Sequence, residues 1–344
     1  MKTPKSFIFK VLPVLNSAIS LNFLIKLTNQ KVIFPFYHAI SDEDIIHIRH
    51  LYKVRTTAQF INDLDLLLKY YRPVSHEDLL NSIRQNNPLR GKCFLLSFDD
   101  GLREFHDIIA PILIRKGIPA VCFLNTAFID NKALFYRYKE SILIEEYERG
   151  NCSPATLNTV QKWFLNNHRS QSFDKNFLRI SYSQRDLIDK LAAIMGYDFP
   201  GYLKVNQPYL TSGQIDKLIF QGFAFGAHSI DHPDYRFISE DEQISQTRES
   251  IKDVCVKFGL DYRLFSFPFT DSGVKRSFFQ KIFDPEQPVA DITFGGAGLK
   301  KDFIASHLQR IPFEGTQLSA EQILASEYVY YLMKAFTGRN RIKR

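Results

Sequence analysis

The chain has 344 residues, of which 45% are hydrophobic and 24% charged, so it is long and apolar enough for one barrel-sized domain or two smaller ones. This composition excludes an intrinsically disordered chain. The formal net charge of +7 includes four basic residues among the last six, at positions 339, 341, 343 and 344, and subtracting them leaves +3. Because no repeat of basic and aromatic residues supports nucleic-acid binding, we expect no nucleic-acid partner.

The first 30 residues combine lysines with an interrupted apolar stretch. Lys10, Asn16 and Asn22 break the stretch, so it lacks the run of about 18 apolar residues that a membrane-spanning helix requires. We expect an amphipathic helix within residues 1–30 that packs on the domain or lies on a membrane surface. The alternative is a signal peptide that is cleaved after Ser20, in which case the protein would be secreted.

The cysteine pattern favours a reducing compartment. The sequence contains four cysteines, three of them in apolar periodic segments, and no C-x-x-C pair: Cys93, Cys122, Cys152 and Cys255. Such residues are typical of buried reduced thiols, whereas disulfides persist in oxidising compartments. We therefore expect a cytoplasmic protein. If the protein associates with a membrane, we expect the N-terminal helix to make the contact.

Strand and helix patterns alternate along residues 31–344, which we interpret as a single domain. The first expected elements are a strand at 31–40, helices that begin after Thr56 and Ser75, a strand at 94–98, a helix that ends at Gly117 and a strand at 119–125. A strand, a helix and a second strand at this spacing predict a right-handed βαβ unit with parallel strands.

Residues 130–205 carry helical runs without strand signals, which predicts a helical insertion over the face where the strands end. Such an insertion shapes substrate access or stabilises the fold. The alternation then resumes with a helix after Thr211, a strand at 223–227, a helix between Ser239 and Gly259, strands at 262–267 and 289–294, and a helix at 320–336. We predict an α/β fold: a distorted (β/α) barrel with a helical insertion.

Two polar motifs follow apolar strands. The strand at 94–98 ends in Asp99 and Asp100, and the strand at 223–227 is followed by His228 and His232. Each motif alone is typical of an ordinary turn or of structural histidines, but parallel strands bring their carboxyl ends to one face, where ligands bind. Two imidazoles and one carboxylate form a three-ligand set typical of catalytic zinc.

In this order, SFDDG at 97–101, HSIDHP at 228–233 and SFPF at 266–269 resemble the motifs of the polysaccharide deacetylase family, also called carbohydrate esterase family 4 or the NodB homology domain. The resemblance spans roughly 32–312 without the insertion. It implies a divalent metal ion, expected to be Zn²⁺, on the second aspartate and the two histidines, and a catalytic base on the first aspartate. The backbone N–H of Phe269 would help to hold the oxyanion. In this sequence the metal ligands are Asp100, His228 and His232, and the base is Asp99.

The third motif departs from the family, because it lacks the arginine that pairs with the base, and the late histidine motif that supplies the acid is also absent. Chains that resemble the circularly permuted poly-N-acetylglucosamine deacetylases carry the acid in an N-terminal Tyr-His motif, which Tyr37-His38 fits. Of the histidines outside the metal motif, only His38 closes an apolar strand, whereas the others fall in loops or helices. We expect His38 to be the general acid. Arg310, at the end of the last strand-like segment, is expected to pair with Asp99, with a surface position as the alternative.

These features together predict a metal-dependent hydrolase that removes N-acetyl or O-acetyl groups from an amino sugar in a polysaccharide or glycan precursor. The expected partner is the acetylated saccharide, and a peripheral membrane contact is left open by the N-terminal helix. Two alternatives remain from the residues themselves: a non-catalytic glycan-binding relative, favoured by the altered third motif, and a hydrolase of a non-sugar amide on the same fold.

Overall fold

The computed structural model describes residues 20–167 and 172–344. Residues 1–19 of the predicted N-terminal helix therefore lie outside the described residues. The same residues make up nearly all of the alternative signal peptide. The described part of the predicted helix is helix α2 (Leu21–Thr28), which is capped by the hydroxyl of Ser20 and packs against helix α14 (Ala320–Ala335). Within the two described ranges, no helix is long and apolar enough to cross a membrane.

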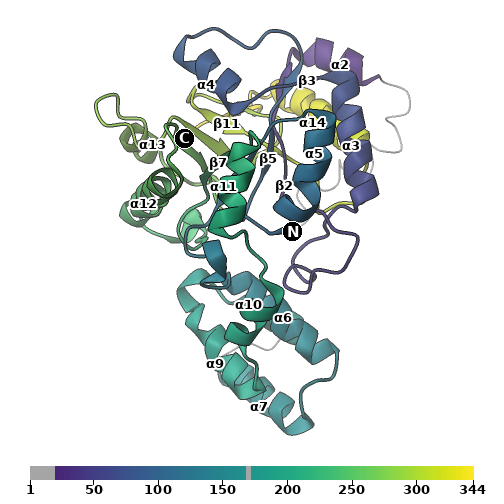
Figure 1. The fold of residues 1–344 in the computed structure, drawn as a ribbon, viewed down its shortest axis with the longest axis vertical. Helices are drawn as coiled ribbons and strands as arrows, with labels where there is room; N and C mark the ends of the chain where they lie inside the picture. Colours follow the sequence, from purple (N-terminus) through teal and green to yellow (C-terminus); the bar gives the residue numbers. More distant parts are fainter. Residues whose placement is uncertain (1–19, 168–171) are drawn as a thin grey trace.

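Among the described residues, eight parallel strands form one sheet at the centre of the molecule (Figure 1). Their order in the sheet is β11 (His307–Gln309), β9 (Ile292–Gly295), β8 (Leu264–Ser266), β7 (Ala224–Ala227), β6 (Ala120–Leu124), β5 (Leu96–Phe98), β2 (Pro35–Tyr37) and β12 (Ile311–Pro312). The two outermost strands are consecutive in the chain, with Arg310 alone between them. One segment therefore pairs with β9 and then with β2, and it closes the sheet into a barrel. The predicted distorted (β/α) barrel is confirmed.

The expected strand at 31–40 divides at Phe34 into β1 (Val32–Ile33) and β2. Only β2 belongs to the barrel, because β1 joins a small parallel sheet with β4 (Cys93–Phe94) and β3 (Arg72–Pro73) at the amino end of the barrel strands. A second small sheet pairs β10 (Lys301–Asp302) with β13 (Arg341–Ile342). Of these short strands, β1 and β4 lead directly into the barrel strands β2 and β5.

Helices cover the outside of the barrel, and several begin where the sequence predicts. They are α3 (Thr57–Tyr70), α4 (His76–Arg84), α5 (Ala110–Lys116), α11 (Ser212–Phe220), α12 (Glu240–Phe258), α13 (Arg276–Ile282) and α14. Capping boxes at Thr56, Ser75 and Thr211 satisfy the first backbone N–H groups of α3, α4 and α11. Gly117 ends α5 in the left-handed conformation.

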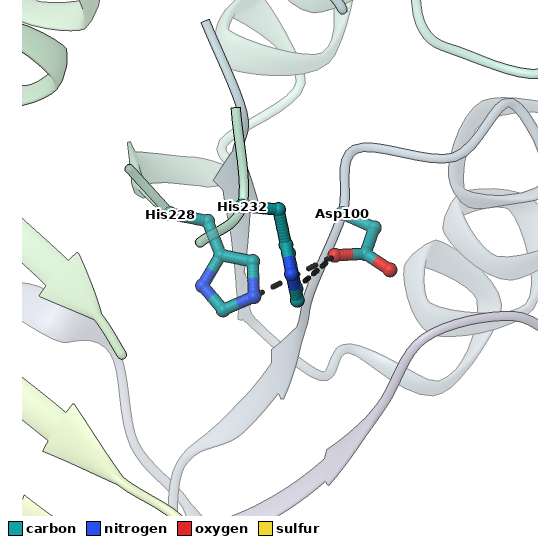
Figure 2. Close-up of side chains that lie close together, drawn as sticks. All are labelled: Asp100, His228 and His232. Carbon is teal, nitrogen blue, oxygen red and sulfur yellow. Dashed lines mark ion pairs between the residues drawn. The ribbon is translucent and has the colours of Figure 1, made fainter. Parts of the chain in front are cut away.

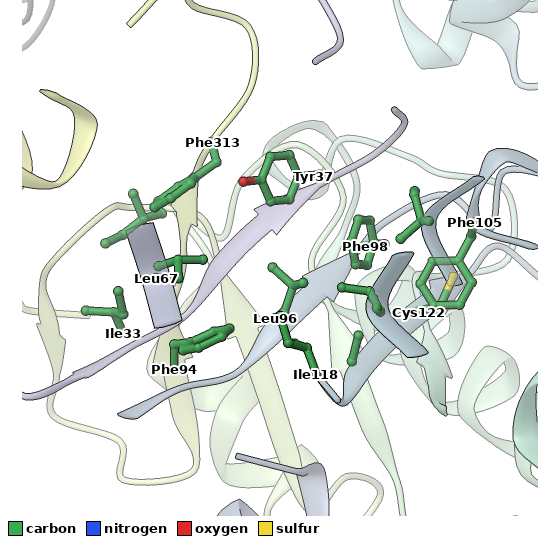
Figure 3. Close-up of a cluster of buried hydrophobic side chains, with 14 of the residues drawn as sticks. Ile33, Tyr37, Leu67, Phe94, Leu96, Phe98, Phe105, Ile118, Cys122 and Phe313 are labelled. Atoms are coloured by element: carbon green, nitrogen blue, oxygen red, sulfur yellow. The ribbon is translucent and has the colours of Figure 1, made fainter. Parts of the chain in front are cut away.

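The core between strands and helices is strongly aromatic. Phe98 on β5 packs against Tyr37, Phe60 and Phe105. Figure 3 shows Phe98 between Tyr37 and Phe105. Cys122 on β6 is fully buried in the same cluster. All four cysteines are free thiols, as the spacing of the cysteines in the sequence indicates.

A lobe of helices lies at one end of the barrel (Figure 1). It consists of α6 (Tyr136–Glu148), α7 (Pro154–Asn166), α8 (Phe173–Phe177), α9 (Asp186–Met195) and α10 (Phe199–Asn206), and its described residues contain no strand. The lobe has a hydrophobic cluster of its own that also includes Ala39 and Leu102, which follow the carboxyl ends of β2 and β5. The lobe therefore covers the face where the strands end. The interpretation of residues 31–344 as one domain stays a prediction.

Candidate active site

Two neighbouring carboxylates leave the end of β5 in different directions. Asp100 has a left-handed backbone with φ 71°, and Gly101 follows with φ 63°. A Cβ atom at Gly101 would lie 2.7 Å from Cδ2 of Leu124, so both the conformation and the close approach require glycine. Because of this turn, the buried carboxylates of Asp99 and Asp100 contact different partners.

Asp99 forms a two-pronged ion pair with Arg310. The guanidinium donates hydrogen bonds of 2.8 and 2.7 Å to the two carboxylate oxygens, and it also bonds the hydroxyls of Ser97 and Ser266. It lies 4.3 Å from the ring centroid of Phe36. Burial is the largest single effect and would raise the pKa of Asp99, but the charge and hydrogen bonds of Arg310, together with the nearby His228 and His38, hold the pKa below its usual value. Asp99 is therefore ionised at neutral pH.

Asp100 faces the two histidines of the second motif. Its Oδ1 lies 3.5 Å from Nε2 of His228 and 3.3 Å from Nε2 of His232 (Figure 2). The Nδ1–H of His228 donates to the carbonyl oxygen of Ser266 at 2.8 Å, which leaves a lone pair on Nε2. Burial lowers the pKa of His228 to about 4, so this imidazole is neutral at pH 7.

The three side chains fit a divalent cation. Ligand atoms of Asp100, His228 and His232 all lie within 4.8 Å of one another, and Oδ1 of Asp100 is buried without a hydrogen-bond partner among the described residues. A carboxylate oxygen that faces imidazole lone pairs is costly to bury unless a positive ion lies between them. The donor set of two imidazoles and one carboxylate suits Zn²⁺.

In the described part of the chain, two other groups of acidic residues and histidines include carboxylates that already pair with arginine. Glu145 bonds Arg149 at 2.7 Å in the first group, and Arg344 lies 2.8 Å from Asp302 in the second. The full groups are His50, Glu145 and Glu148, and Asp271, Asp302 and His307. Because Glu145, Asp271 and Asp302 already pair with arginine, the group at the strand ends is the one of the three, among the described residues, that combines converging ligands with a buried unpaired oxygen.

The spacing of the histidine motif follows from the turn that carries it. Ser229 and His232 both have positive φ, at 70° and 63°. The hydroxyl of Ser229 accepts a 3.0 Å hydrogen bond from the backbone N–H of His232, and the side-chain amide of Asn125 donates to the carbonyl of His228. These bonds hold a tight turn that brings both imidazoles to Asp100.

His38 follows β2 and pairs with Glu314, a residue after β12 that no sequence motif marks. Nδ1 of His38 contacts one carboxylate oxygen, and the backbone N–H of His38 donates to the other at 3.1 Å. Burial lowers the pKa of the imidazole, but the charge and hydrogen bond of Glu314, together with the carboxylates of Asp100 and Asp99, offset this and raise the pKa to about 9. His38 is therefore protonated at neutral pH.

All seven site residues proposed from the sequence line one cavity of about 410 Å³. They are His38, Asp99, Asp100, His228, His232, Phe269 and Arg310. Residues from the helical lobe and from the loop after β2 also line the cavity, namely Phe135, Arg137, Leu178, His50, Leu51 and Tyr52. A volume of this size suits a small organic group or a sugar ring.

Solved structures with a similar fold include deacetylases. They include the Streptococcus pyogenes deacetylase PplD in complex with acetate (TM-score 0.54, 15% identity, 86% of this chain and 98% of that chain). IcaB from Ammonifex degensii has a TM-score of 0.53 at 15% identity over 87% and 97% of the two chains. A de-N-acetylase from Aggregatibacter actinomycetemcomitans has a TM-score of 0.53 at 14% identity over 85% and 99%. At these identities the likeness shows the fold.

The family model for polysaccharide deacetylase matches residues 86–179. The resemblance to polysaccharide deacetylases is confirmed. The match contains the Asp99-Asp100 motif of this family and continues into the helical lobe, which was expected to lie outside the resemblance, while the histidine motif follows the matched segment. No curated protein matches the chain.

The third motif also reaches the cavity, through Phe269. Its φ of 54° and the hydrogen bond from Thr270 N–H to the carbonyl of Pro268 form a strained γ-turn. Among the described residues, the backbone N–H of Phe269 has no acceptor. The ring is 45% exposed and lies 4.6 Å from the ring of His232.

The expectation that the other histidines lie in loops or on helices away from the strand ends is wrong for two of them. His50 lines the cavity, because the loop after β2 folds back across the strand ends. His307 lies on β11 and is buried beside Asp271. Periodicity identifies strands and helices, but it does not trace the path of a loop, and β11 is too short to show a clear strand pattern.

Replacing His232 with alanine removes one of the three candidate ligands. We expect the affinity for Zn²⁺ to fall by more than the roughly 10–100-fold typical of losing an outer-shell partner. Competition with a chromophoric chelator measures this affinity, and His106→Ala, outside the cavity, serves as the matched control. Unchanged Zn²⁺ affinity in the His232 variant would contradict the site.

Proposed function

We propose that the protein is a divalent-metal-dependent hydrolase that removes acetyl groups from an amino sugar of a polysaccharide or a glycan precursor. The observation that carries the proposal is the convergence of an ionised Asp99, a protonated His38 and the Asp100, His228 and His232 triad on one cavity. The likeness to polysaccharide deacetylases supports the acetylated saccharide as the class of substrate.

Asp99 acts as the base that accepts a proton from the attacking water. Arg310 keeps this carboxylate ionised, and its two-pronged contact fixes the carboxylate plane. The ion pair lowers the basicity of Asp99, so a water beside it must be made more acidic. A divalent ion on Asp100, His228 and His232 would make such a water more acidic and polarise the acetyl carbonyl.

His38 acts as the acid that protonates the amine nitrogen as the C–N bond breaks. Amide cleavage needs this proton because an amine anion is a very poor leaving group. Glu314 supports the role, since it holds Nδ1 and keeps the imidazolium charged at neutral pH. In the complete reaction the attacking water supplies the second oxygen of acetate, the C–N bond breaks, and the sugar leaves as a free amine.

The backbone N–H of Phe269 donates a hydrogen bond to the carbonyl oxygen as negative charge develops on it. The strained γ-turn holds this N–H without an internal acceptor, which is typical of oxyanion donors. The contact between Arg310 and Asp99 supports the catalytic alternative over the non-catalytic one, because Arg310 supplies the pairing for which the third motif lacks an arginine.

The proposed activity is tested by acetate release from acetylated amino-sugar oligomers. We expect the Zn²⁺-loaded protein to release acetate and Asp99→Asn to lose at least about 10²-fold in turnover, as removal of a positioned base does. Zn²⁺ content is measured in both proteins. If the loaded protein releases no acetate from any acetylated saccharide, the proposed function is wrong.

Arg310→Ala changes the pH dependence of kcat/KM. Because Arg310 lowers the pKa of Asp99, its removal raises that pKa, and the acidic limb of the profile moves to higher pH by roughly one to three pH units. Arg310→Lys keeps the charge and should move the limb less. An acidic limb that stays in place in Arg310→Ala would contradict the role given to this pair.

His38→Ala separates the acid from the rest of the site. We expect a loss of about 10²–10⁴-fold in turnover on the acetamide, with Zn²⁺ binding retained. The loss should be much smaller on an activated acetyl ester, whose leaving group departs without a proton. Equal losses on the two substrates would make His38 a residue that positions the substrate.

A further inference from the structure

The helical lobe touches the candidate metal site through Tyr138 on α6. The Tyr138 hydroxyl donates a 2.7 Å hydrogen bond to Oδ2 of Asp100, and the side chain is fully buried. A carboxylate only accepts hydrogen bonds, so the phenol is the donor. A residue of the lobe, 38 positions along the chain, thus completes the surroundings of a residue at the end of β5.

This hydrogen bond makes the two oxygens of Asp100 unequal. Oδ2 is bonded to Tyr138, whereas Oδ1 faces both imidazoles and has no partner among the described residues (Figure 2). Rotation about the last side-chain bond of an aspartate is soft and would exchange the two oxygens. The hydrogen bond opposes that rotation and keeps Oδ1 directed towards His228 and His232.

The Tyr138 ring is held firmly enough to act as a support. Its centroid lies 5.0 Å from that of Phe135, 4.9 Å from that of His47 and 6.1 Å from that of Tyr209. Phe135, at the start of α6, also packs against the ring of His232 at 4.4 Å. The beginning of α6 therefore contacts two of the three candidate ligands.

We infer that the helical lobe is part of the metal site and that Tyr138 is a positioning residue, which selects Oδ1 of Asp100 as the ligand oxygen. The inference rests on the metal assignment in the proposed function and is independent of the substrate. It gives the lobe a role in metal binding as well as in forming one wall of the cavity.

The test is the Zn²⁺ affinity of Tyr138→Phe, measured by competition with a chromophoric chelator in the absence of substrate. This variant loses only the hydroxyl, so we expect Zn²⁺ to bind about 10–100-fold more weakly. Tyr202→Phe is the matched control, because Tyr202 lies in the same lobe and its hydroxyl bonds Nδ1 of His47 without contacting Asp100. Its Zn²⁺ affinity should equal that of the wild type.

A double-mutant cycle with Asp100→Ala separates positioning from a general loss of structure. Without the carboxylate, Tyr138→Phe should cause no further loss of Zn²⁺ affinity, whereas damage to the lobe would weaken binding in both backgrounds and overturn the inference. Unchanged affinity in Tyr138→Phe, or an equal loss in Tyr202→Phe, also overturns it while the proposed function stands. A wild type that binds no Zn²⁺ would overturn both.

Discussion

Arg310 and Asp99 are buried together inside the barrel, and taking such charges out of water costs several kcal/mol for each ion. The cost is offset here by two short parallel hydrogen bonds between them and by the hydroxyls of Ser97 and Ser266. Arg310 stands where the closing segment changes its pairing from β9 to β2. The same residue thus contacts groups on β5 and β8 from the closing segment and lowers the pKa of Asp99, so one ion pair connects the place of barrel closure with the site.

The site separates the tasks of two adjacent carboxylates by giving them different neighbours. Both carboxylate oxygens of Asp99 accept hydrogen bonds from the Arg310 guanidinium. Asp99 is therefore ionised, and its oxygens are less available to bind a metal ion. Asp100, turned away by its left-handed backbone, has no arginine or lysine partner among the described residues and faces two imidazoles. This difference in neighbours fits the roles proposed for the two residues, with Asp99 as the base and Asp100 as a metal ligand.

The sequence could predict the features that local pattern controls. Strand patterns, capping boxes and helix-ending glycines predicted the barrel. Asp100 and His228 could be identified because each comes at the end of an apolar strand. The sequence could not predict the contacts that loops and the helical lobe make with the site. Glu314 reaches His38 across 276 positions and Tyr138 reaches Asp100 from the lobe, and neither carries a local pattern that names its partner. The folding back of the loop that carries His50 was hidden for the same reason.

The central claim is that the strand-end triad, and no other acid and histidine group, is the metal centre. Anomalous diffraction at the zinc absorption edge from crystals of the Zn²⁺-loaded protein tests it most directly. We expect a single strong peak between Asp100, His228 and His232. A peak at the group that includes Glu145 or at the group that includes Asp271 would contradict the account, as would the absence of a peak in fully loaded crystals.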